Sequence, residues 1–405
     1  MNSMTPPPAP AVPPQAGTGP ATPAAGARGV KPRCLVVTFN RLVPADQGNA
    51  RRIMQLVSVY KRMGFEVDLL YHNEEGFDSA LSHSLQAEFG RVSVVRSRAP
   101  KQIHEGHVCR IGEWYDRGLE PVARDMHRLR GYKVVHVNYV WYTPLLDIFG
   151  SDVTKVLDTH DIFGERREKY TRAGMQPQWF SCSIPDENTA IRRADAALAI
   201  QKEEGAEMAA RGHRNILYLP YVEPAEKPFA PPDGSRPLTF GYLGSGNDWN
   251  ILSLVEFLNQ LRAKGTPFPH PIVVAGGVCR HIRDTPGVIK LGFVQDLRTF
   301  YEAIDIALNP MVGGTGLKIK TVEPLCHGKS VLTTLAGAQG LTHLWQLPVF
   351  TNTQGLTDYL FSELANNSAP AVAQLSALAG STRAALDAEY DGQADRFSRW
   401  LTARL

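Results

Sequence analysis

Cysteine is scarce in this 405-residue sequence, and long apolar runs are missing. The five cysteines are scattered with no C-x-x-C spacing, which argues against a disulfide framework and against a zinc site. No window approaches the ~20 consecutive apolar residues that a membrane-spanning helix needs. The sequence therefore predicts a protein with reduced thiols in the cytoplasm, with at most peripheral contact at the inner face of the membrane.

An excess of either charge is also missing, since 43 Lys and Arg stand against 40 Asp and Glu for a net charge of +3. Charge therefore gives no reason to expect a nucleic-acid partner. Three local basic sets remain, and each is ordinarily a solvated face. Contact with anionic lipid or with an acidic glycan acceptor is the alternative. The sets are Arg51, Arg52, Gln55, Ser58 and Arg62; Arg124, Arg128 and Arg130; and Arg166, Arg167 and Lys169.

Residues 1–30 are mostly Pro, Ala and Gly, with almost no charge. They lack the apolar segment of a secretory signal, and Arg28 is their one arginine where a transit peptide has several. We expect a disordered Pro/Ala-rich tail. The whole chain also lacks a Walker loop and the HExxH and GxSxG motifs, so three common enzyme chemistries have no support.

After the tail, short apolar runs alternate with amphipathic stretches, which is typical of parallel sheets covered by helices on both faces. A length of 405 residues exceeds one hydrophobic core. The expected helices include 50–63, 251–261, 297–304 and the segment after Lys320. The expected strands are 34–38, 65–71, 92–95, 134–137, 155–157, 196–200, 216–219, 238–243, 272–275, 288–291, 304–308 and 331–333.

A proline-rich stretch divides this alternation into two. We predict an α/β protein with two Rossmann-like domains facing each other across a cleft. Ligands of such sheets lie beyond the carboxyl ends of the strands. The expected parts are an N-terminal domain (31–222), a linker (223–236), a C-terminal domain (237–385) and a last helix (386–405) that could cross back to the first domain.

The segment 309–329 carries the strongest chemical signal, because a strand runs through a glycine-rich loop into a helix. Glycines let backbone N–H groups approach an anion, and the start of a helix adds positive potential. Lys318 and Lys320 add full charges, and the carboxylate of Glu323 can accept from hydroxyl groups. Pro324 predicts a late helix start, with Glu323 in or near the first turn. The plainer alternative is a generic strand-to-helix turn with solvated lysines.

This segment resembles the donor site of the group-1 glycosyltransferases, also called glycosyltransferase family 4, which have the GT-B fold. The resemblance lies in Gly-Thr-Gly-Leu-Lys-Ile-Lys-Thr-Val-Glu-Pro-Leu-Cys-His-Gly-Lys, which begins at Gly314. The stretches 293–297 and 303–310 are similar to the approach to that site. Gly241-Tyr242-Leu243-Gly244-Ser245 is similar to the first strand and phosphate loop of the family's C-terminal domain.

The resemblance implies a hexosyl- or related glycosyltransferase, a retaining enzyme that needs no metal and no cofactor. Its donor would be a nucleotide-sugar, and its acceptor a glycan, a lipid-linked or another molecule, as in cell-surface polysaccharide or glycoconjugate synthesis. The absence of an Asp-x-Asp motif agrees, because it disfavours the metal-dependent GT-A chemistry. In the family no protein nucleophile is required, since a donor phosphate oxygen can take the acceptor's proton on the same face.

By position, Glu323 matches the second glutamate of the family's paired-glutamate motif, which holds the nucleotide ribose. The first glutamate would fall at Thr315, and this departure leaves the contact to the donor sugar open. The family's Arg and Lys after the first C-terminal strand are also missing, and Lys318 is our substitute for neutralising the diphosphate. The expected donor-binding residues are Gly48, Gly244, Ser245, Gly314, Thr315, Gly316, Leu317, Lys318 and Glu323.

Two segments of the first half complete the expected site. Gly48 lies in the turn after the first strand, where a glycine lets the loop pass close to the donor; an ordinary turn with an Asn49 cap is the alternative. His160 ends a strand at the cleft side. It would hydrogen-bond a donor or acceptor hydroxyl group, or act as a base against Asp158 or Asp161. The expected catalytic residues are His160, Lys318 and Glu323.

Two other functions fit the same residues. One is a GT-B nucleotide-sugar epimerase that uses the same cleft without an acceptor. The other is a catalytically silent partner subunit that binds the nucleotide-sugar, which the departures at Thr315 and after the first C-terminal strand would explain. Product analysis separates the three functions, because only a transferase labels an acceptor.

Overall fold

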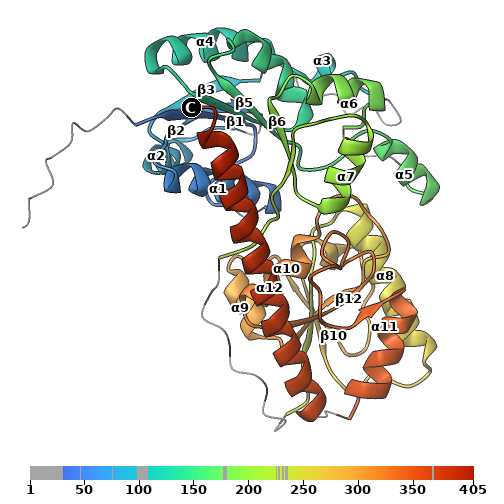
Figure 1. Cartoon of the computed structure of the whole chain (residues 1–405). Helices are drawn as coiled ribbons and strands as arrows, with labels where there is room; N and C mark the ends of the chain where they lie inside the picture. The colour runs from blue at the N-terminus through green and yellow to red at the C-terminus, as the bar shows by residue number, and fades with distance from the viewer. Residues whose placement is uncertain are drawn as a thin grey trace, which may run out of the picture. The chain divides into compact units, whose positions relative to one another are not determined.

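The computed structural model describes residues 31–45, 47–74, 76–97, 108–176, 180–224, 226, 229, 232, 236–366 and 369–405. Within it, Pro32–Leu405 is one compact unit (Figure 1). The expected tail 1–30 lies outside the described residues, as does much of the expected linker, including 233–235.

The first sheet has seven parallel strands in the order β3-β2-β1-β4-β5-β6-β7. The order reverses between β1 and β4, which makes a topological switch point of the Rossmann type. The strands are β1 (Arg33–Thr38), β2 (Glu66–Asn73), β3 (Val92–Arg96), β4 (Val134–Asn138), β5 (Thr154–Asp158), β6 (Ala196–Ala199) and β7 (Ile216–Tyr218). The helices between them are α1 (Gly48–Arg62), α2 (Ser79–Glu88), α3 (Ile111–Trp114), α4 (Leu119–Arg130), the 3₁₀ helix η1 (Val140–Ile148), α5 (Arg166–Arg172), α6 (Ile184–Ile191) and α7 (Lys202–Ala210).

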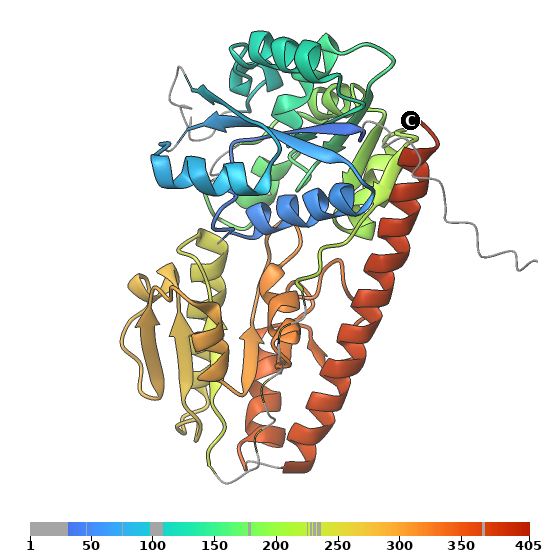
Figure 2. The ribbon, with the colours of Figure 1, turned by 90° about the vertical axis from the view of Figure 1, so that its left-hand side faces the viewer.

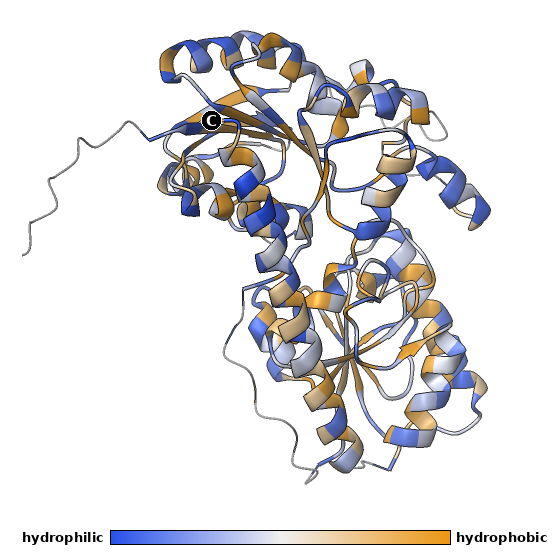
Figure 3. Cartoon of the chain, in the orientation of Figure 1, coloured by the Kyte–Doolittle hydropathy of each residue, from blue (hydrophilic) through white to orange (hydrophobic). Residues whose placement is uncertain are grey.

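Alternating side chains of the central strands build a core on each face of this sheet. Leu35 and Val37 of β1 join one cluster, with residues of α3, α4, η1 and α6. Cys34 and Val36 join the other, with residues of α1 and α2. Because side chains of a strand alternate between faces, a strand that is apolar throughout must be covered on both sides. Figure 3 shows these strands as hydrophobic.

The second sheet has six parallel strands in the order β10-β9-β8-β11-β12-β13, again with a reversal at its centre, between β8 and β11. The strands are β8 (Phe240–Leu243), β9 (Ile272–Ala275), β10 (Val288–Gly292), β11 (Ile306–Asn309), β12 (Ser330–Thr334) and β13 (Val349–Phe350). The helices are α8 (Asp248–Ala263), the 3₁₀ helix η2 (Gly277–Arg280), α9 (Leu297–Glu302), α10 (Ile319–Cys326), α11 (Thr353–Tyr359), the π-helical turn η3 (Leu360–Leu364) and α12 (Ala369–Thr402).

The long α12 helix, red in Figure 2, contributes to two cores. Its N-terminal part, with Leu375 and Leu386, packs into the cluster of the second sheet. Its end, with Phe397 and Leu401, packs into the cluster that contains α1. The Phe397 ring lies edge-on to Tyr60 of α1, with the ring centroids 5.8 Å apart.

The predicted α/β class with two Rossmann-like parallel sheets is confirmed. One local prediction is wrong: Pro324 does not mark a late helix start. The α10 helix begins at Ile319, so Pro324 lies inside it and Glu323 lies in its second turn. Pro324 is the sixth residue of α10, and its missing N–H does not affect the first turn. That turn forms through a hydrogen bond from the Thr321 N–H to the Lys318 carbonyl oxygen, 2.8 Å long. In the described part of the chain, no helix has the length and apolar character to cross a membrane.

Candidate functional site

The centre of the second sheet brings two predicted loops together. Gly244 and Ser245 follow β8, and the glycine loop 313–317 follows β11, the two strands that flank the switch point. A crevice forms at such a point because the connections on its two sides leave in opposite directions. The sequence-predicted donor residues of the second half therefore follow the strands where this fold binds ligands.

The glycine loop adopts backbone conformations that only glycine takes easily. Gly314 has φ 110° and Gly316 has φ 68°. Gly313 is required for space, because a Cβ atom there would lie 2.4 Å from the Trp249 ring. Leu317 is half-buried against the core of the second sheet. The loop is thus built by packing at its two ends and by glycine conformations between them.

The loop after β8 is held by the start of α8. Asn247 caps α8 by accepting from the Asn250 N–H over 2.9 Å. The Asn250 side chain donates to the carbonyl and to the hydroxyl oxygen of Ser245, each over 3.1 Å. Gly244 is buried, and its carbonyl oxygen would lie 2.3 Å from a Cβ atom at Gly276. Ser245 is exposed next to the first turn of α8.

Lys318 is the last residue before α10 and folds back onto the glycine loop. Its ammonium group donates to the carbonyls of Gly316 (2.8 Å) and Gly314 (3.2 Å). The residue is 7% exposed. Burial lowers the pKa of Lys318 to about 8, although Asp161 and Glu204 oppose the shift. Lys318 therefore fixes the loop and carries positive potential at its surface.

Lys320 brings a second cation to the neighbouring loop. Its ammonium group donates to the side-chain oxygen of Asn250 and to the Tyr242 hydroxyl group, which is 3.2 Å away. Burial lowers the pKa of Lys320 to about 7, and the charge of Lys318 adds to the effect. Lys318 and Lys320, two residues apart, thus place one cation beside each loop of the switch point.

Glu323 is buried and fully engaged. One oxygen binds the Arg51 guanidinium of α1, and the other accepts from the Tyr301 hydroxyl group over 3.1 Å. Burial raises the pKa of Glu323, while Arg51 opposes the shift. Arg51 also binds Glu223 over 2.8 Å. The predicted ribose-binding carboxylate therefore lies against the first half of the chain and has a cation as its partner.

Of the two predicted residues of the first half, Gly48 follows the switch-point strand β1, and His160 follows β5, the strand next to β4. Gly48 is the first residue of α1, after β1. A Cβ atom at Gly48 would lie 2.1 Å from Cδ1 of Ile319, so the glycine permits close approach of α1 and α10. Asn49 does not cap the helix; its amide donates to the Tyr139 hydroxyl group over 3.0 Å. The alternative of an ordinary Asn-capped turn is therefore wrong.

His160, two residues after β5, has φ 60°, which is uncommon for a residue with a side chain. Its ring stacks on Tyr139, with the centroids 4.1 Å apart. The Asn138 amide nitrogen donates to the Val37 carbonyl, so the Asn138 oxygen accepts from Nε2 of His160 over 3.0 Å. This assigns the proton to Nε2 and leaves Nδ1 as an acceptor. Burial lowers the pKa of His160 to about 4, so the ring is neutral near pH 7.

The glycine loop also contacts the residue after His160. The Thr315 hydroxyl group donates to the Asp161 carboxylate over 2.6 Å. The Arg166 guanidinium lies 3.7 Å from the same oxygen of Asp161. Thr315, which stands where the resemblance implies a glutamate, therefore lies against a carboxylate of the first half.

Sequence reasoning missed several of these neighbours. Arg51 and Arg52 were expected on a solvated face, and for both this is wrong. Arg52 is 1% exposed and binds Asp158 through Nε over 3.1 Å. Glu204 of α7 is buried near Asp161 and Lys318, and burial raises its pKa well above its ordinary value. No local sequence pattern predicts a contact such as that of Arg52 with Asp158, because the two residues are 106 positions apart in the sequence.

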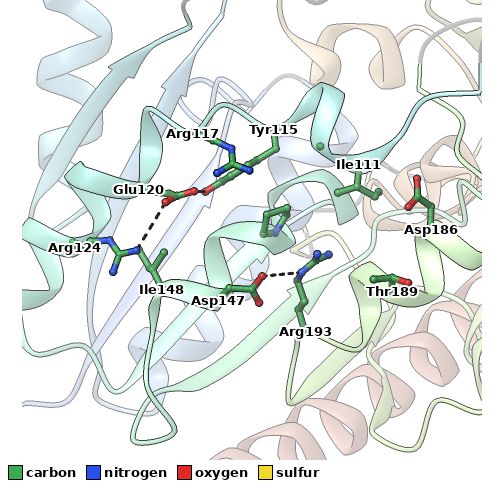
Figure 4. Close-up of a pocket in the computed structure, with 12 residues that line it drawn as sticks. Ile111, Tyr115, Arg117, Glu120, Arg124, Asp147, Ile148, Asp186, Thr189 and Arg193 are labelled. Atoms are coloured by element: carbon green, nitrogen blue, oxygen red, sulfur yellow. Dashed lines mark hydrogen bonds and ion pairs between the residues drawn. The ribbon is translucent and has the colours of Figure 1, made fainter.

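Two further features lie apart from the loops. Among the described residues, no group of three or more His, Cys, Asp or Glu side chains is arranged to hold a metal ion. A pocket of about 420 Å³ lies between α3, α4, η1 and α6. Its walls carry the ion pair of Asp147 with Arg193, 3.1 Å apart, and that of Glu120 with Arg124, 3.9 Å apart (Figure 4). None of the sequence-predicted site residues lines it.

Comparisons with known proteins agree with this architecture. Residues 237–351 match the family model described as "Glycosyl transferases group 1". Sucrose-phosphate synthase from Thermosynechococcus elongatus is similar in structure, with a TM-score of 0.66, 14% identity, and coverage of 93% of this chain and 100% of that chain. HepE of Anabaena, solved with UDP and glucose, gives a TM-score of 0.59, 14% identity, and coverage of 92% and 99%.

TarM of S. aureus, solved as a variant with fondaparinux, alpha-GlcNAc-glycerol and UDP, gives a TM-score of 0.65 at 9% identity, with coverage of 93% of this chain and 100% of that chain. A comparison with curated protein sequences found no match. At these identities the structural likeness speaks for the fold, and it confirms the predicted GT-B arrangement of two Rossmann-like domains. Residues 237–351 are thus a group 1 glycosyl transferase domain, as the resemblance implied.

Proposed function

We propose that the chain is a glycosyltransferase that moves a sugar from a nucleotide-sugar donor to a glycan, lipid-linked or other acceptor. The observation that carries the proposal is that the family match and two lysines fall on the same two loops. The family match at 237–351 covers both loops of the second switch point, and two lysines lie beside these loops, the buried Lys318 and the half-buried Lys320. HepE, which has the same fold, was solved with UDP and glucose.

In this proposal the diphosphate lies against the glycine loop. Backbone N–H groups of the loop and the ammonium groups of Lys318 and Lys320 neutralise its charge. Glu323 accepts from the ribose hydroxyl groups once its contact with Arg51 is exchanged. The neutral ring of His160 offers Nδ1 to a sugar or acceptor hydroxyl group. A pKa of about 4 favours this role over that of a general base.

The proposed transfer proceeds with retention and without a metal ion or cofactor. The bond between the sugar's anomeric carbon and the donor phosphate breaks, and the acceptor oxygen bonds to that carbon on the same face. A phosphate oxygen of the leaving diphosphate takes the acceptor's proton. The protein then contributes positioning and charge neutralisation instead of a nucleophile.

A panel of nucleotide sugars tests the proposal directly. The correct donor raises the melting temperature, because a ligand that binds the folded state stabilises it. With that donor, release of nucleoside diphosphate and labelling of an acceptor identify a transferase. Glu323→Ala should weaken donor binding, and Lys318→Ala should lower turnover more than binding. Lys264→Ala, which removes a surface cation paired with Asp358, serves as the control. Unchanged kinetics in both site variants would remove the proposed donor site.

Metal independence has its own test. Addition of a chelator should leave turnover unchanged, since the lysines and backbone N–H groups supply the positive charge. A strong loss that added divalent metal restores would contradict this account. The cytoplasmic location, the peripheral contact with anionic membrane and the role in cell-surface polysaccharide or glycoconjugate synthesis remain predictions.

Two observations favour the silent nucleotide-sugar-binding partner as a second candidate. Both oxygens of Glu323 are engaged, by Arg51 and by Tyr301, and Thr315 replaces the family's first glutamate. A silent partner would bind a nucleotide sugar in the panel yet release no diphosphate. An epimerase would change the sugar without an acceptor, so the same product analysis separates all three functions.

A further inference from the structure

The contact between the glycine loop and Asp161 joins two segments that are 154 residues apart in sequence. The Thr315 hydroxyl group donates to Oδ2 of Asp161 over 2.6 Å. A Cβ atom at Gly316 would lie 3.8 Å from Oδ1 of Asp161 and 3.7 Å from the His160 carbonyl oxygen. The chain therefore sets the Asp161 carboxylate directly against the loop that we propose binds the donor.

The carboxylate has acceptor capacity left in this position. Its Oδ1 accepts from the Ile162 N–H over 2.9 Å, and its Oδ2 accepts from Thr315. Arg166, at 3.7 Å, lies beyond hydrogen-bonding distance of Oδ2. A carboxylate can accept about four hydrogen bonds, so two remain for a ligand. The side chain of Asp161 is 14% exposed, so a ligand can reach these two remaining acceptor positions.

The charge of Asp161 also suits a sugar that is attached to a diphosphate. The carboxylate interacts with the ammonium group of Lys318, which we assign to the diphosphate. The sugar of a nucleotide sugar follows directly after the diphosphate, so its hydroxyl groups pass within reach of a group next to Lys318. A carboxylate binds such hydroxyl groups strongly, because hydrogen bonds to charged acceptors are about twice as strong as neutral ones.

We propose that Asp161 binds the hydroxyl groups of the donor sugar and does the work of the glutamate that is missing at position 315. A glutamate at 315 would extend past the position of the Thr315 hydroxyl group, into the space that the Asp161 carboxylate occupies. In this chain a threonine holds a carboxylate that the other half supplies. The proposal rests on the proposed function, and it assigns Asp161 to the sugar instead of the nucleotide.

A reciprocal exchange tests the assignment. Binding of UDP-glucose, UDP-N-acetylglucosamine and GDP-mannose is measured against binding of UDP and GDP for four proteins: wild type, Asp161→Asn, Thr315→Glu and the double variant. Asp161→Asn should weaken binding of the nucleotide sugar by about 10- to 100-fold, the range for loss of hydrogen bonds to a charged group, with the nucleoside diphosphate unaffected. Thr315→Glu alone should also weaken nucleotide-sugar binding, because two carboxylates then share one place.

The double variant is the decisive test of whether the carboxylate of Asp161 replaces the missing glutamate. With the carboxylate moved from position 161 to position 315, nucleotide-sugar binding should return to within a few-fold of wild type. Recovery supports the proposal. A double variant that binds no better than Asp161→Asn overturns it, as does an Asp161→Asn protein that binds nucleotide sugar and diphosphate with the wild-type ratio.

Thr315→Val keeps the test decisive if Asp161→Asn does not fold. This variant keeps the carboxylate and the side-chain volume but removes the hydroxyl group that holds the carboxylate. It should weaken nucleotide-sugar binding and leave diphosphate binding unchanged, and an equal loss for both ligands would overturn the proposal. Failure of the proposed function is a different result, namely a wild-type protein that binds none of the nucleotide sugars.

Discussion

Arg52 shows at the scale of one residue how a charge can be structural. Its guanidinium binds Asp158 and also donates to the Pro220 carbonyl over 3.1 Å, and both partners are far from it in sequence. Arg52→Ala leaves the Asp158 carboxylate buried without its partner, which costs about 3–5 kcal/mol. Chemical denaturation measures the loss. Lys61→Ala on the same helix, whose partner Glu88 is at the surface, should cost about 0–1 kcal/mol. Equal losses in the two variants would contradict this interpretation.

Glu204 should make stability depend on pH. Burial raises its pKa in the folded protein above its ordinary value of 4.5. The folded state then holds the proton more tightly than the unfolded state, so the stability from this group is present below about pH 4.5 and falls as pH rises towards the folded pKa.

Glu204→Gln removes this dependence. We expect the variant to gain stability over wild type at pH 8 and little at pH 4, by denaturation at both values. A wild-type protein that gains stability relative to the variant as pH rises would show that Lys318 holds Glu204 ionised.

The residues that could be predicted from the sequence depend on local features of the chain. Those that were missed depend on contacts with residues far away in the sequence. The loop glycines could be predicted, because positions with a positive φ favour glycine, and a run of glycines is visible in the sequence itself. His160 could be predicted from its place after a strand. Arg51 could not, because a polar position on an amphipathic helix has the same pattern whether it faces water or, as here, Glu223 and Glu323 from distant parts of the chain.

At the scale of elements, the glycine loop should be sensitive to a single methyl group. Gly314 has φ 110°, so Gly314→Ala strains the backbone by about 1–3 kcal/mol and displaces the Lys318 contact. We expect lower stability together with weaker donor binding. Gly380→Ala in α12 is the matched control: its Cβ atom would meet nothing within 4 Å, and a helical alanine is favoured by about 0.5–1 kcal/mol. Thermal unfolding of the two variants should therefore shift in opposite directions.

Short apolar runs located the strands of both sheets except β13. The expected strands 134–137 and 272–275 differ from β4 and β9 by at most one residue, because both strands are fully buried and mostly apolar. The two-residue β13 gave no signal, since it is defined by its pairing with β12. The start of α10 was misjudged because Pro324 suggested a first turn. In fact the turn forms five residues earlier, where Lys318 ends the glycine loop.

At the scale of the whole molecule, α12 and the contacts of Arg51 connect the two halves of the chain that the sequence predicts as separate domains. The helix carries Leu375 in one core and Phe397 in the other. Arg51 of α1 binds Glu323 of α10, close to where Gly48 meets Ile319. If donor ribose binds Glu323, it competes with Arg51 for the same carboxylate. Ligand binding and the Arg51 contact are then thermodynamically linked, so that each weakens the other.

Arg51→Ala tests this linkage. Without its competitor, Glu323 should bind UDP more tightly, on the order of 10-fold, while the unliganded protein loses stability. Saturating UDP should then raise the melting temperature of the variant more than that of wild type. Arg62→Ala removes an exposed arginine of the same helix, which binds Tyr390 over 3.1 Å, and should leave UDP affinity unchanged. If Arg51→Ala binds UDP more weakly than wild type, Arg51 aids the ligand instead of competing with it, because the linkage fixes the sign of the change.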